Sequence, residues 1–193
     1  MGDLPCGRSP KGFCIDSCIG KETVMYLWVA IHTDGQMREL RERAEAAGAV
    51  FSLPLHISLK ISFPVEESRV PDAMAAIRAY YATLAPFSVE VQGIEQNGGI
   101  VWLRMKENDT LQRIHRELDR RMEENFGVLP HPYDGDYRFH TTLFIGDEQR
   151  AAEIYEELRS ASVPSVIRVS RLLIGGSESG RAEDYSVLET YSL

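Results

Sequence analysis

The sequence predicts an α+β protein built from two similar halves. Its segments follow the order strand, helix, strand, helix, strand, and this order then repeats with one extra strand at the end. Matching elements lie at similar separations, since the distance along the chain from Val24 to Ile100 is close to that from Phe87 to Ser165. Residue identities differ between the halves, so the repeat is one of architecture.

The composition is that of a globular protein in water. A chain of 193 residues suits one domain or two fused halves, and 44% hydrophobic and 26% charged residues are ordinary values. No apolar run reaches the roughly 20 residues that span a membrane, and the N-terminus has no signal-peptide pattern. We therefore expect a cytoplasmic monomer that does not associate with membranes.

The charge argues against one class of partner. The formal net charge is −8, and no block of lysine and arginine is present. Proteins that wrap long nucleic acid need such cations to neutralise phosphates, so no long nucleic acid is expected as a partner. A small anionic ligand in a locally positive pocket is compatible with this charge.

Residues 1–22 differ from the rest of the chain. They contain glycines and prolines without a clear period, which predicts a flexible tail. All three cysteines lie here, at Cys6, Cys14 and Cys18. Three thiols without a fourth ligand do not make a closed zinc site, so we expect reduced thiols and no metal, with an intermolecular disulfide as the alternative.

The first half contains five predicted elements. Residues 23–32 are rich in β-branched and aromatic side chains, which predicts a strand. A helix capped by Asp34 and ended by Gly48 follows, and residues 55–63 alternate as a strand. A second helix near residues 71–85 precedes a strand over residues 86–94.

The second half begins at the hairpin signal "QNGG", residues 96–99. The elements expected after it are a strand, a helix from Asn108 or Asp109 to Gly127, a strand, and a helix capped by Asp147. The segment "SVIRVSRLLI" predicts one further strand, and "YSVLETYS" predicts the last.

The two matching strands, 55–63 and 139–145, carry the same polar pattern. Side chains alternate faces along a strand, so one polar face shows His56 and Ser58 and the other shows His140 and Thr142. Of the five histidines, only these two have Ser or Thr two residues later. A single motif would indicate a partly exposed strand histidine, but two copies at equivalent places favour a shared functional site.

The motifs "HISL" and "HTTL", which begin at His56 and His140, resemble those of the two-histidine (2H) phosphoesterases. That superfamily includes 2'-5' RNA ligase-like proteins and RNA 2',3'-cyclic phosphodiesterases. The resemblance covers about residues 23–193, including the closing strands, although Phe139 stands where a proline often precedes the second histidine. It implies one bilobal domain with a pseudo-twofold axis, in which two antiparallel-rich sheets flanked by helices surround a central cleft. The lobes would be about residues 23–95 and 99–193.

The resemblance also implies a metal-independent phosphodiesterase without a cofactor, acting on an RNA terminus or small nucleotide that carries a cyclic phosphate. A histidine pKa near 6.5 allows one imidazole to deprotonate water and the other to protonate the departing ribose oxygen. The similarity of the halves leaves open whether His56 or His140 is the acid. The hydroxyls of Ser58 and Thr142 can donate hydrogen bonds to phosphate oxygens. No carboxylate cluster in the sequence indicates a metal site.

Further side chains are candidates for substrate contacts, and some have a structural alternative. Two cations near the motifs could bind phosphate or could be surface charges: Lys60 and Arg138. Two aromatic residues on one face of the first strand could stack on a base or belong to the core: Tyr26 and Trp28. Two tyrosines in the loop before the second motif could line the mouth of the cleft: Tyr133 and Tyr137.

Two other functions fit the same residues. A nucleotide- or RNA-end-binding module would keep the cleft without turnover, and a 2'-5' RNA ligase would run the reverse chemistry. The presence of both His56 and His140 favours an enzyme, since a binding module would tolerate the loss of either. Hydrolysis of nucleoside 2',3'-cyclic phosphates distinguishes the enzyme from the binding module.

Overall fold

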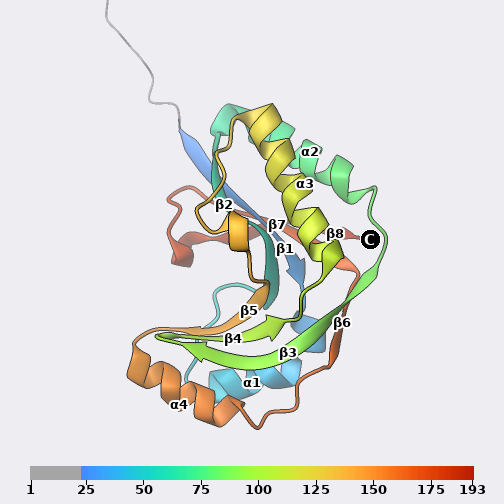
Figure 1. Ribbon diagram of the computed structural model, residues 1–193. Helices are drawn as coiled ribbons and strands as arrows, with labels where there is room; N and C mark the ends of the chain where they lie inside the picture. Colours follow the sequence, from blue (N-terminus) through green and yellow to red (C-terminus); the bar gives the residue numbers. More distant parts are fainter. Residues whose placement is uncertain (1–22) are drawn as a thin grey trace, which may run out of the picture.

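The computed structural model describes residues 23–193, and the predicted tail with Cys6, Cys14 and Cys18 lies outside this range (Figure 1). The described chain folds into two four-stranded sheets and four α-helices. Every strand pair is antiparallel. The predicted α+β class, with two antiparallel sheets flanked by helices, is confirmed.

The first sheet combines strands from the start and the end of the described chain, and the second sheet takes its strands from the part between them. The first sheet has the order β2-β1-β7-β8, with the bounds β2 His56–Glu66, β1 Val24–His32, β7 Arg171–Ser177 and β8 Ser186–Ser192. The second sheet has the order β5-β4-β3-β6, with the bounds β5 His140–Ile145, β4 Ile100–Met105, β3 Phe87–Asn97 and β6 Val166–Val169.

The sheets therefore do not follow the expected division into residues 23–95 and 99–193. Strand β3 belongs to the second sheet because the Gly98–Gly99 turn folds it directly onto β4. Strands β7 and β8 return to the first sheet. The segment predicted as one strand, "SVIRVSRLLI", is two strands in different sheets, separated at Ser170. Strand β6 buries alternate residues, whereas β7 is buried along almost its whole length between β1 and β8.

The helices also cross over between the halves (Figure 1). Helices α2 (Val70–Tyr81) and α3 (Asp109–Phe126) pack on β2 in the first sheet. Helices α1 (Arg38–Ala46) and α4 (Glu148–Leu158) pack on β5 in the second sheet. Four short 3-10 turns complete the described chain, at Asp34–Gln36, Glu67–Arg69, Asp134–Asp136 and Ala182–Asp184.

Capping residues explain where two of these helices start. The side chains of Asn108 and Asp147 accept hydrogen bonds from the backbone N–H groups of Leu111 and Arg150, at 3.0 and 2.9 Å. Helix α3 then ends at Gly127, whose φ of 67° is left-handed. The prediction that Asp34 caps the first helix is wrong. It lies in a 3-10 turn, and α1 begins only at Arg38.

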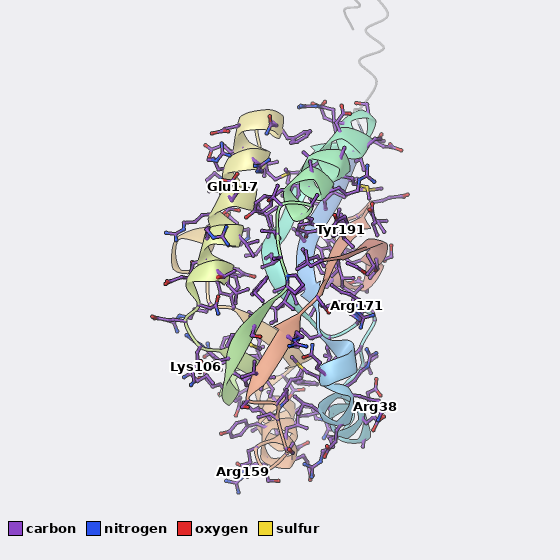
Figure 2. The ribbon with its side chains drawn as sticks, turned by 90° about the vertical axis from the view of Figure 1, so that its right-hand side faces the viewer. Arg38, Lys106, Glu117, Arg159, Arg171 and Tyr191 are labelled. Atoms are coloured by element: carbon purple, nitrogen blue, oxygen red, sulfur yellow. The ribbon has the colours of Figure 1, made fainter. Side chains whose placement is uncertain are left out.

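Most of the apolar side chains form one large core between the sheets and the helices. Charged side chains such as Arg38, Lys106 and Arg159 lie on the outside (Figure 2). A second, small cluster contains Trp28, Ala30 and Leu173 and lies apart from the main core. No helix in residues 23–193 is long and apolar enough to cross a membrane.

The two motif strands lie next to each other. Strands β2 and β5 are each the edge strand of their sheet, and they contact each other where the sheets meet. Figure 1 shows the two strands side by side at the centre of the molecule. The fold thus brings together two segments that are far apart in sequence, and each of them begins with a histidine.

Candidate active site

His56 is the first residue of β2, and its ring is held from two sides. Its Nδ1 lies 2.8 Å from the carbonyl oxygen of Pro54. A carbonyl oxygen only accepts hydrogen bonds, so Nδ1–H is the donor and Nε2 of the neutral ring keeps its lone pair. The ring also contacts the indole of Trp28 on β1, with centroids 4.6 Å apart and an angle of 41° between the planes.

His140 is the first residue of β5 and is held in the same way. Its Nδ1 lies 2.7 Å from the carbonyl oxygen of Arg138, again two residues earlier in the chain. Its ring contacts the indole of Trp102 on the neighbouring strand β4, at 4.9 Å and 41°. Both histidines therefore have a fixed tautomer and a fixed plane.

Arg104 distinguishes the surroundings of His140 from those of His56. It is the register partner of His140 on β4, whereas the partner of His56 on β1 is His32. Burial lowers the pKa of His140, and the nearby charge of Arg104 lowers it further, against the opposing effect of the hydrogen bond to the Arg138 carbonyl. His140 is accordingly a neutral imidazole at neutral pH, with Nε2 able to accept a proton.

The hydroxyl residues of the two motifs are both half-buried. Ser58 pairs with Ala30 on β1. Thr142 pairs with Trp102 on β4. The alternation of β2 and β5 places each hydroxyl two residues from its histidine, on the same strand face.

A cavity of about 210 Å³ lies beside His56 and Ser58. Its remaining lining is largely apolar and comes from β1, β2 and the segment between β7 and β8: Trp28, Leu53, Ile61, Ser62, Ala182 and Tyr185. The hydroxyls of Ser62 and Tyr185 are hydrogen-bonded to each other. The cavity combines apolar walls with a few polar groups, which is typical of a site for part of a small ligand.

Lys60 does not lie where the sequence placed it. Its side chain is 1% exposed, and Nζ lies 2.6 Å from Asp119 Oδ1 and 3.1 Å from Asp134 Oδ2. The pairing of β2 with β1 shifts register between Ser58 and Lys60, so one extra residue of β2 breaks the strict alternation. The ammonium group is thereby buried against two carboxylates, and Lys60 is neither a surface charge nor a side chain of the cavity beside His56.

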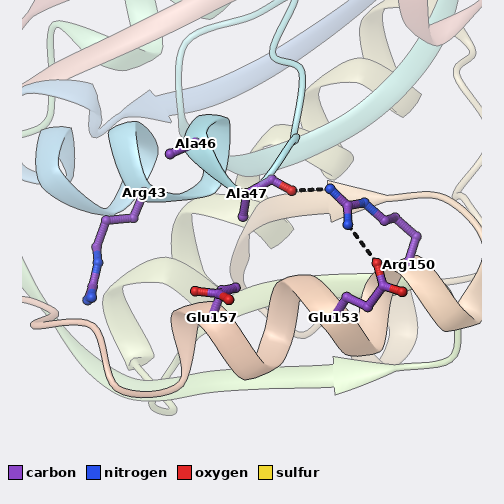
Figure 3. Close-up of a pocket in the computed structure, with 6 residues that line it drawn as sticks. All are labelled: Arg43, Ala46, Ala47, Arg150, Glu153 and Glu157. Atoms are coloured by element: carbon purple, nitrogen blue, oxygen red, sulfur yellow. Dashed lines mark hydrogen bonds and ion pairs between the residues drawn. The ribbon is translucent and has the colours of Figure 1, made fainter.

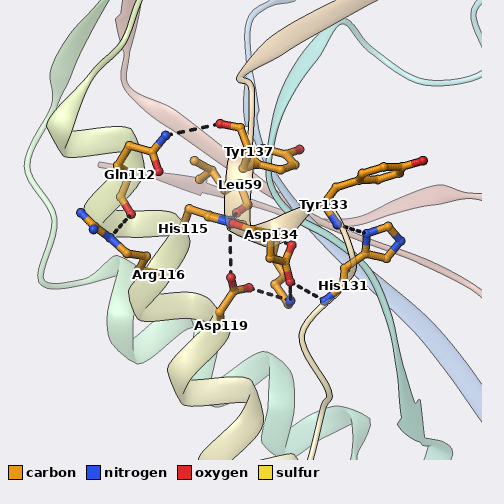
Figure 4. A network of polar contacts seen from close by, with 10 residues as sticks. Leu59, Gln112, His115, Arg116, Asp119, His131, Tyr133, Asp134 and Tyr137 are labelled. Carbon is orange, nitrogen blue, oxygen red and sulfur yellow. Dashed lines mark hydrogen bonds and ion pairs between the residues drawn. The ribbon is translucent and has the colours of Figure 1, made fainter.

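The partners of Lys60 belong to a polar cluster that the sequence did not predict (Figure 4). One side-chain nitrogen or oxygen atom from each of His115, Asp119 and Asp134 could coordinate a metal ion, and these atoms lie within 4.8 Å of one another. His115 is on α3 and is fully buried. Its Nδ1 atom lies 2.8 Å from the carbonyl oxygen of Leu59. The sequence indicated no carboxylate cluster for a metal, and both carboxylates of this cluster pair with the ammonium group of Lys60.

The other predicted contact residues are spread over different environments. Trp28 is 5% exposed and supports the His56 ring, while the ring of Tyr26 lies against Gly180. Tyr133 is 71% exposed and contacts the ring of His131. The ring of Tyr137 stacks on His115, and the backbone carbonyl of Arg138 orients His140.

Sequence reasoning missed Trp102 and Arg104. Both lie on one face of the strand "IVWLRM". The number of residues between Trp28 and Trp102 is close to the spacing between matching elements of the repeat. The chain has only these two tryptophans, one in the first strand of each half. The equivalent positions of the two tryptophans could have indicated a shared role. In the structure, each indole contacts the histidine of its own lobe.

Two of the larger cavities are formed by helices and lie away from the motifs. One has a volume of about 530 Å³ and lies between α1 and α4, where the guanidinium of Arg150 contacts the Ala47 carbonyl oxygen and Glu153 (Figure 3). The other has a volume of about 550 Å³ and is lined by Tyr80 of α2 and by residues of α3. Neither contains a residue of the two motifs.

Comparison with known proteins gives a consistent result. The model of the family described as "2'-5' RNA ligase superfamily" matches residues 21–180. A Geobacillus kaustophilus protein named "Putative phosphoesterase" is 25% identical over 149 residues, which is 72% of this chain and 78% of that protein. Crystal structures of Escherichia coli LigT share the fold. The apo form has a TM-score of 0.57 at 18% identity, and the complex with 3'-AMP has a TM-score of 0.61 at 17% identity. Both alignments cover 88% of this chain and 98% of LigT.

Proposed function

The chain belongs to the 2'-5' RNA ligase superfamily of 2H phosphoesterases, and on this premise we propose that it is a phosphodiesterase that opens cyclic phosphates by two-histidine acid–base catalysis. The substrate is a 2',3'-cyclic RNA end or a small cyclic nucleotide. The observation that carries the proposal is the matched setting of His56 and His140, each with Nδ1 bound to a carbonyl oxygen and its ring against a tryptophan.

The reaction needs one proton removed and one proton delivered. A water oxygen attacks phosphorus while one imidazole Nε2 takes its proton, and the bond from phosphorus to a ribose oxygen breaks. The second imidazole, protonated at Nε2, gives its proton to that ribose oxygen. Ser58 and Thr142 donate hydrogen bonds to the non-bridging oxygens as negative charge builds on them.

The cavity beside His56 supports a division of the two roles. The nucleoside carries the leaving oxygen, and the apolar walls of this cavity suit a base next to His56. His56 is then the acid, and His140, on the opposite side of the phosphorus, is the base that activates water. The lowered pKa of His140 supports this assignment, because a base must be neutral before it accepts a proton.

Arg104 supplies the positive charge that the sequence assigned to Lys60. Its Nε is buried without a hydrogen-bond partner within residues 23–193, and its Nη1 lies 3.7 Å from Glu95 Oε2. A guanidinium next to His140 can hold a non-bridging phosphate oxygen in addition to Thr142.

The nature of the ligand is supported by related structures. LigT has been crystallised with 3'-AMP, with ATP and with NADP+. A cavity of about 210 Å³ is smaller than the roughly 300 Å³ at which sites for drug-sized ligands begin, so it suits a single base rather than an oligonucleotide. The proposed partner is therefore a small nucleotide or the terminal nucleotide of an RNA.

The deciding experiment is hydrolysis of the four nucleoside 2',3'-cyclic phosphates, followed by phosphorus NMR of the products. We expect turnover to a nucleoside monophosphate that persists in EDTA, since no step above uses a metal. Binding of the cyclic nucleotide without turnover would identify a binding module. Joining of a 2',3'-cyclic end to a 5'-hydroxyl end, without hydrolysis, would identify a ligase. Activity that is lost in EDTA and restored by a divalent ion would contradict the acid–base mechanism.

A further inference from the structure

The buried imidazole of His115 contacts the strand of the first motif. His115 is on α3 and is 0% exposed. Its Nδ1 lies 2.8 Å from the carbonyl oxygen of Leu59, the residue that follows Ser58 on β2 (Figure 4). A carbonyl oxygen only accepts hydrogen bonds, so Nδ1–H is the donor. This hydrogen bond ties the middle of α3 to the first motif.

Leu59 is the extra residue at the irregularity in β2. The register of β2 with β1 includes Ser58 and Lys60 but passes over Leu59. A bulge of this kind leaves the extra residue outside the regular ladder and changes the direction of the side chains around it. The bond from His115 gives the Leu59 carbonyl oxygen a partner. It therefore stabilises the bulge that turns Lys60 inward while Ser58 lines the cavity beside His56.

The ring of His115 also supports the segment that leads into the second motif. It stacks on the ring of Tyr137, with centroids 4.6 Å apart and 20° between the planes, and it meets the edge of Phe139 at 6.0 Å and 88°. These two residues flank Arg138, whose carbonyl oxygen lies 2.7 Å from Nδ1 of His140. His115 thus holds the two flanking rings, and the peptide between them orients the imidazole of His140.

The second ring nitrogen fixes the orientation of His115 itself. Nε2 lies 3.3 Å from Asp119 Oδ2 and 3.3 Å from the backbone carbonyl oxygen of Asp134. Lys60 pairs with both carboxylates, at 2.6 and 3.1 Å. The oxygen atoms next to both ring nitrogens are acceptors, so a doubly protonated imidazole satisfies each of them. A ring bound at both nitrogens has little freedom to turn away from the two motifs.

We propose that His115 is a positioning residue that sets the relative placement of the two motifs. Through Leu59 it fixes the strand that carries Ser58, and through the two flanking rings it fixes the carbonyl group that orients His140. The transition state contacts groups of both motifs at once, so an error of about 1 Å in their spacing is costly. The inference rests on the proposed function, because that function assigns both motifs to one reaction.

Three substitutions separate the contacts of His115. His115→Phe keeps an aromatic ring against Tyr137 but removes the hydrogen bond to Leu59, and His115→Ala removes both contacts. We expect kcat to fall on the order of 10-fold in His115→Phe and 100-fold in His115→Ala. The amide N–H of His115→Asn can reach the Leu59 carbonyl oxygen, so this variant should be about 3- to 10-fold faster than His115→Ala. KM should stay within about 2-fold, because the lost placement acts in the transition state.

Met122→Ala is the matched control for a loss of stability. Met122 is 0% exposed and lies about two turns beyond His115 on the same helix. Its truncation leaves a cavity and lowers stability, but it should leave kcat unchanged. An equal loss of kcat in Met122→Ala, an unchanged kcat in His115→Phe, or a change confined to KM would overturn the proposal. Failure of all three His115 variants to fold would also overturn it, since His115 would then serve stability alone.

An NMR titration of His140 reports the placement of its ring without any turnover. Burial lowers the pKa of His140, the hydrogen bond to the Arg138 carbonyl raises it, and the charge of Arg104 lowers it. The two variants without a ring at position 115 should displace that carbonyl group, so the pKa of His140 should fall further, whereas Met122→Ala should not change it. An unmoved titration in both variants would end the positioning role, even in a protein that hydrolyses cyclic phosphates. A lowered pKa without hydrolysis in the wild type would support the placement of His140 and end the proposed function alone.

Discussion

The indole of Trp28 inclines at 41° to the ring of His56, the same angle that the indole of Trp102 makes with the ring of His140. The centroid distances, 4.6 and 4.9 Å, are also close. Trp28 reaches this position because its register partner on β7 is Gly175, which has no side chain to occupy the space. In the other lobe the register partner of Trp102 is Glu95, which accepts a hydrogen bond from the indole N–H.

Substitution of Gly175 should impair catalysis without touching a motif residue. In Gly175→Ala, the new Cβ would overlap Nε1 of Trp28, so the indole must move and the His56 ring loses its support. We expect kcat/KM to fall on the order of 10- to 100-fold, because a displacement of about 1 Å can cost that much. Gly135→Ala is the control, since its Cβ would meet no atom within 4 Å. Equal kinetics in the two variants would show that Trp28 does not position His56.

The two histidines should respond differently to the leaving group. His56→Ala and His140→Ala should each lower the rate on the order of 10² to 10⁴-fold with a nucleoside 2',3'-cyclic phosphate. With sulfur as the leaving atom no acid is needed, so His56→Ala should recover most of its rate and His140→Ala should not. Recovery in His140→Ala alone would reverse the assigned roles. The double variant should lose less than the product of the single losses.

The dependence of kcat/KM on pH should change when the charge of Arg104 is removed. His140 must be neutral to act as the base, so kcat/KM falls as the pH drops through the pKa of His140, which lies below the ordinary 6.5. Arg104→Met removes a charge that lowers this pKa, so the acidic limb should move to higher pH. Arg38→Met, on the exposed face of α1, should leave the limb in place. An NMR titration of His140 in both variants checks the cause, and an unmoved His140 titration in Arg104→Met would contradict it.

The cavity beside His56 should discriminate between substrates with and without a base. Tyr185→Ala removes one wall, so we expect KM for a nucleoside cyclic phosphate to rise on the order of 10-fold, the value of a lost apolar or stacking contact. KM for ethylene phosphate, which has the cyclic ester but no base, should not change. Tyr133→Ala is the control, because Tyr133 is exposed and does not line this cavity. A similar rise for both substrates would place the base elsewhere.

Lys60 should affect stability rather than substrate binding. Lys60→Met leaves Asp119 and Asp134 without their shared ammonium group, and breaking a buried pair in this way costs about 3–5 kcal/mol of unfolding free energy. The triple variant with Asp119→Asn and Asp134→Asn should recover part of that loss, as measured by chemical denaturation. KM should change little in whichever variants fold. A raised KM with unchanged stability would return Lys60 to the phosphate.

The sequence predicted most elements because their signals are local. Alternation marked β2 and β5, and capping side chains marked the starts of α3 and α4. The histidine and hydroxyl of each motif could be grouped from spacing alone. The break between β6 and β7 at Ser170 could not be predicted, since it depends on which sheet each strand joins.

The errors at the site have the same physical origin. Lys60 was assigned to the face of His56 because strict alternation was assumed, and one extra residue in β2 breaks that alternation. The cluster of His115, Asp119 and Asp134 cannot be recognised along the chain, because it forms only when α3 and the loop that contains Asp134 meet on β2.

The exchange of strands between the two halves has a consequence for the order in which the protein becomes active. Strand β1 is synthesised early, but one of its two neighbours is β7, near the other end of the chain. Until β7 emerges from the ribosome, β1 has an open edge that can pair with another chain, and the surface that supports Trp28 does not exist. Closing so long a loop is also slow. The ring of His56 therefore gains its support from Trp28 only after β7 has been made, long after His56 itself is translated.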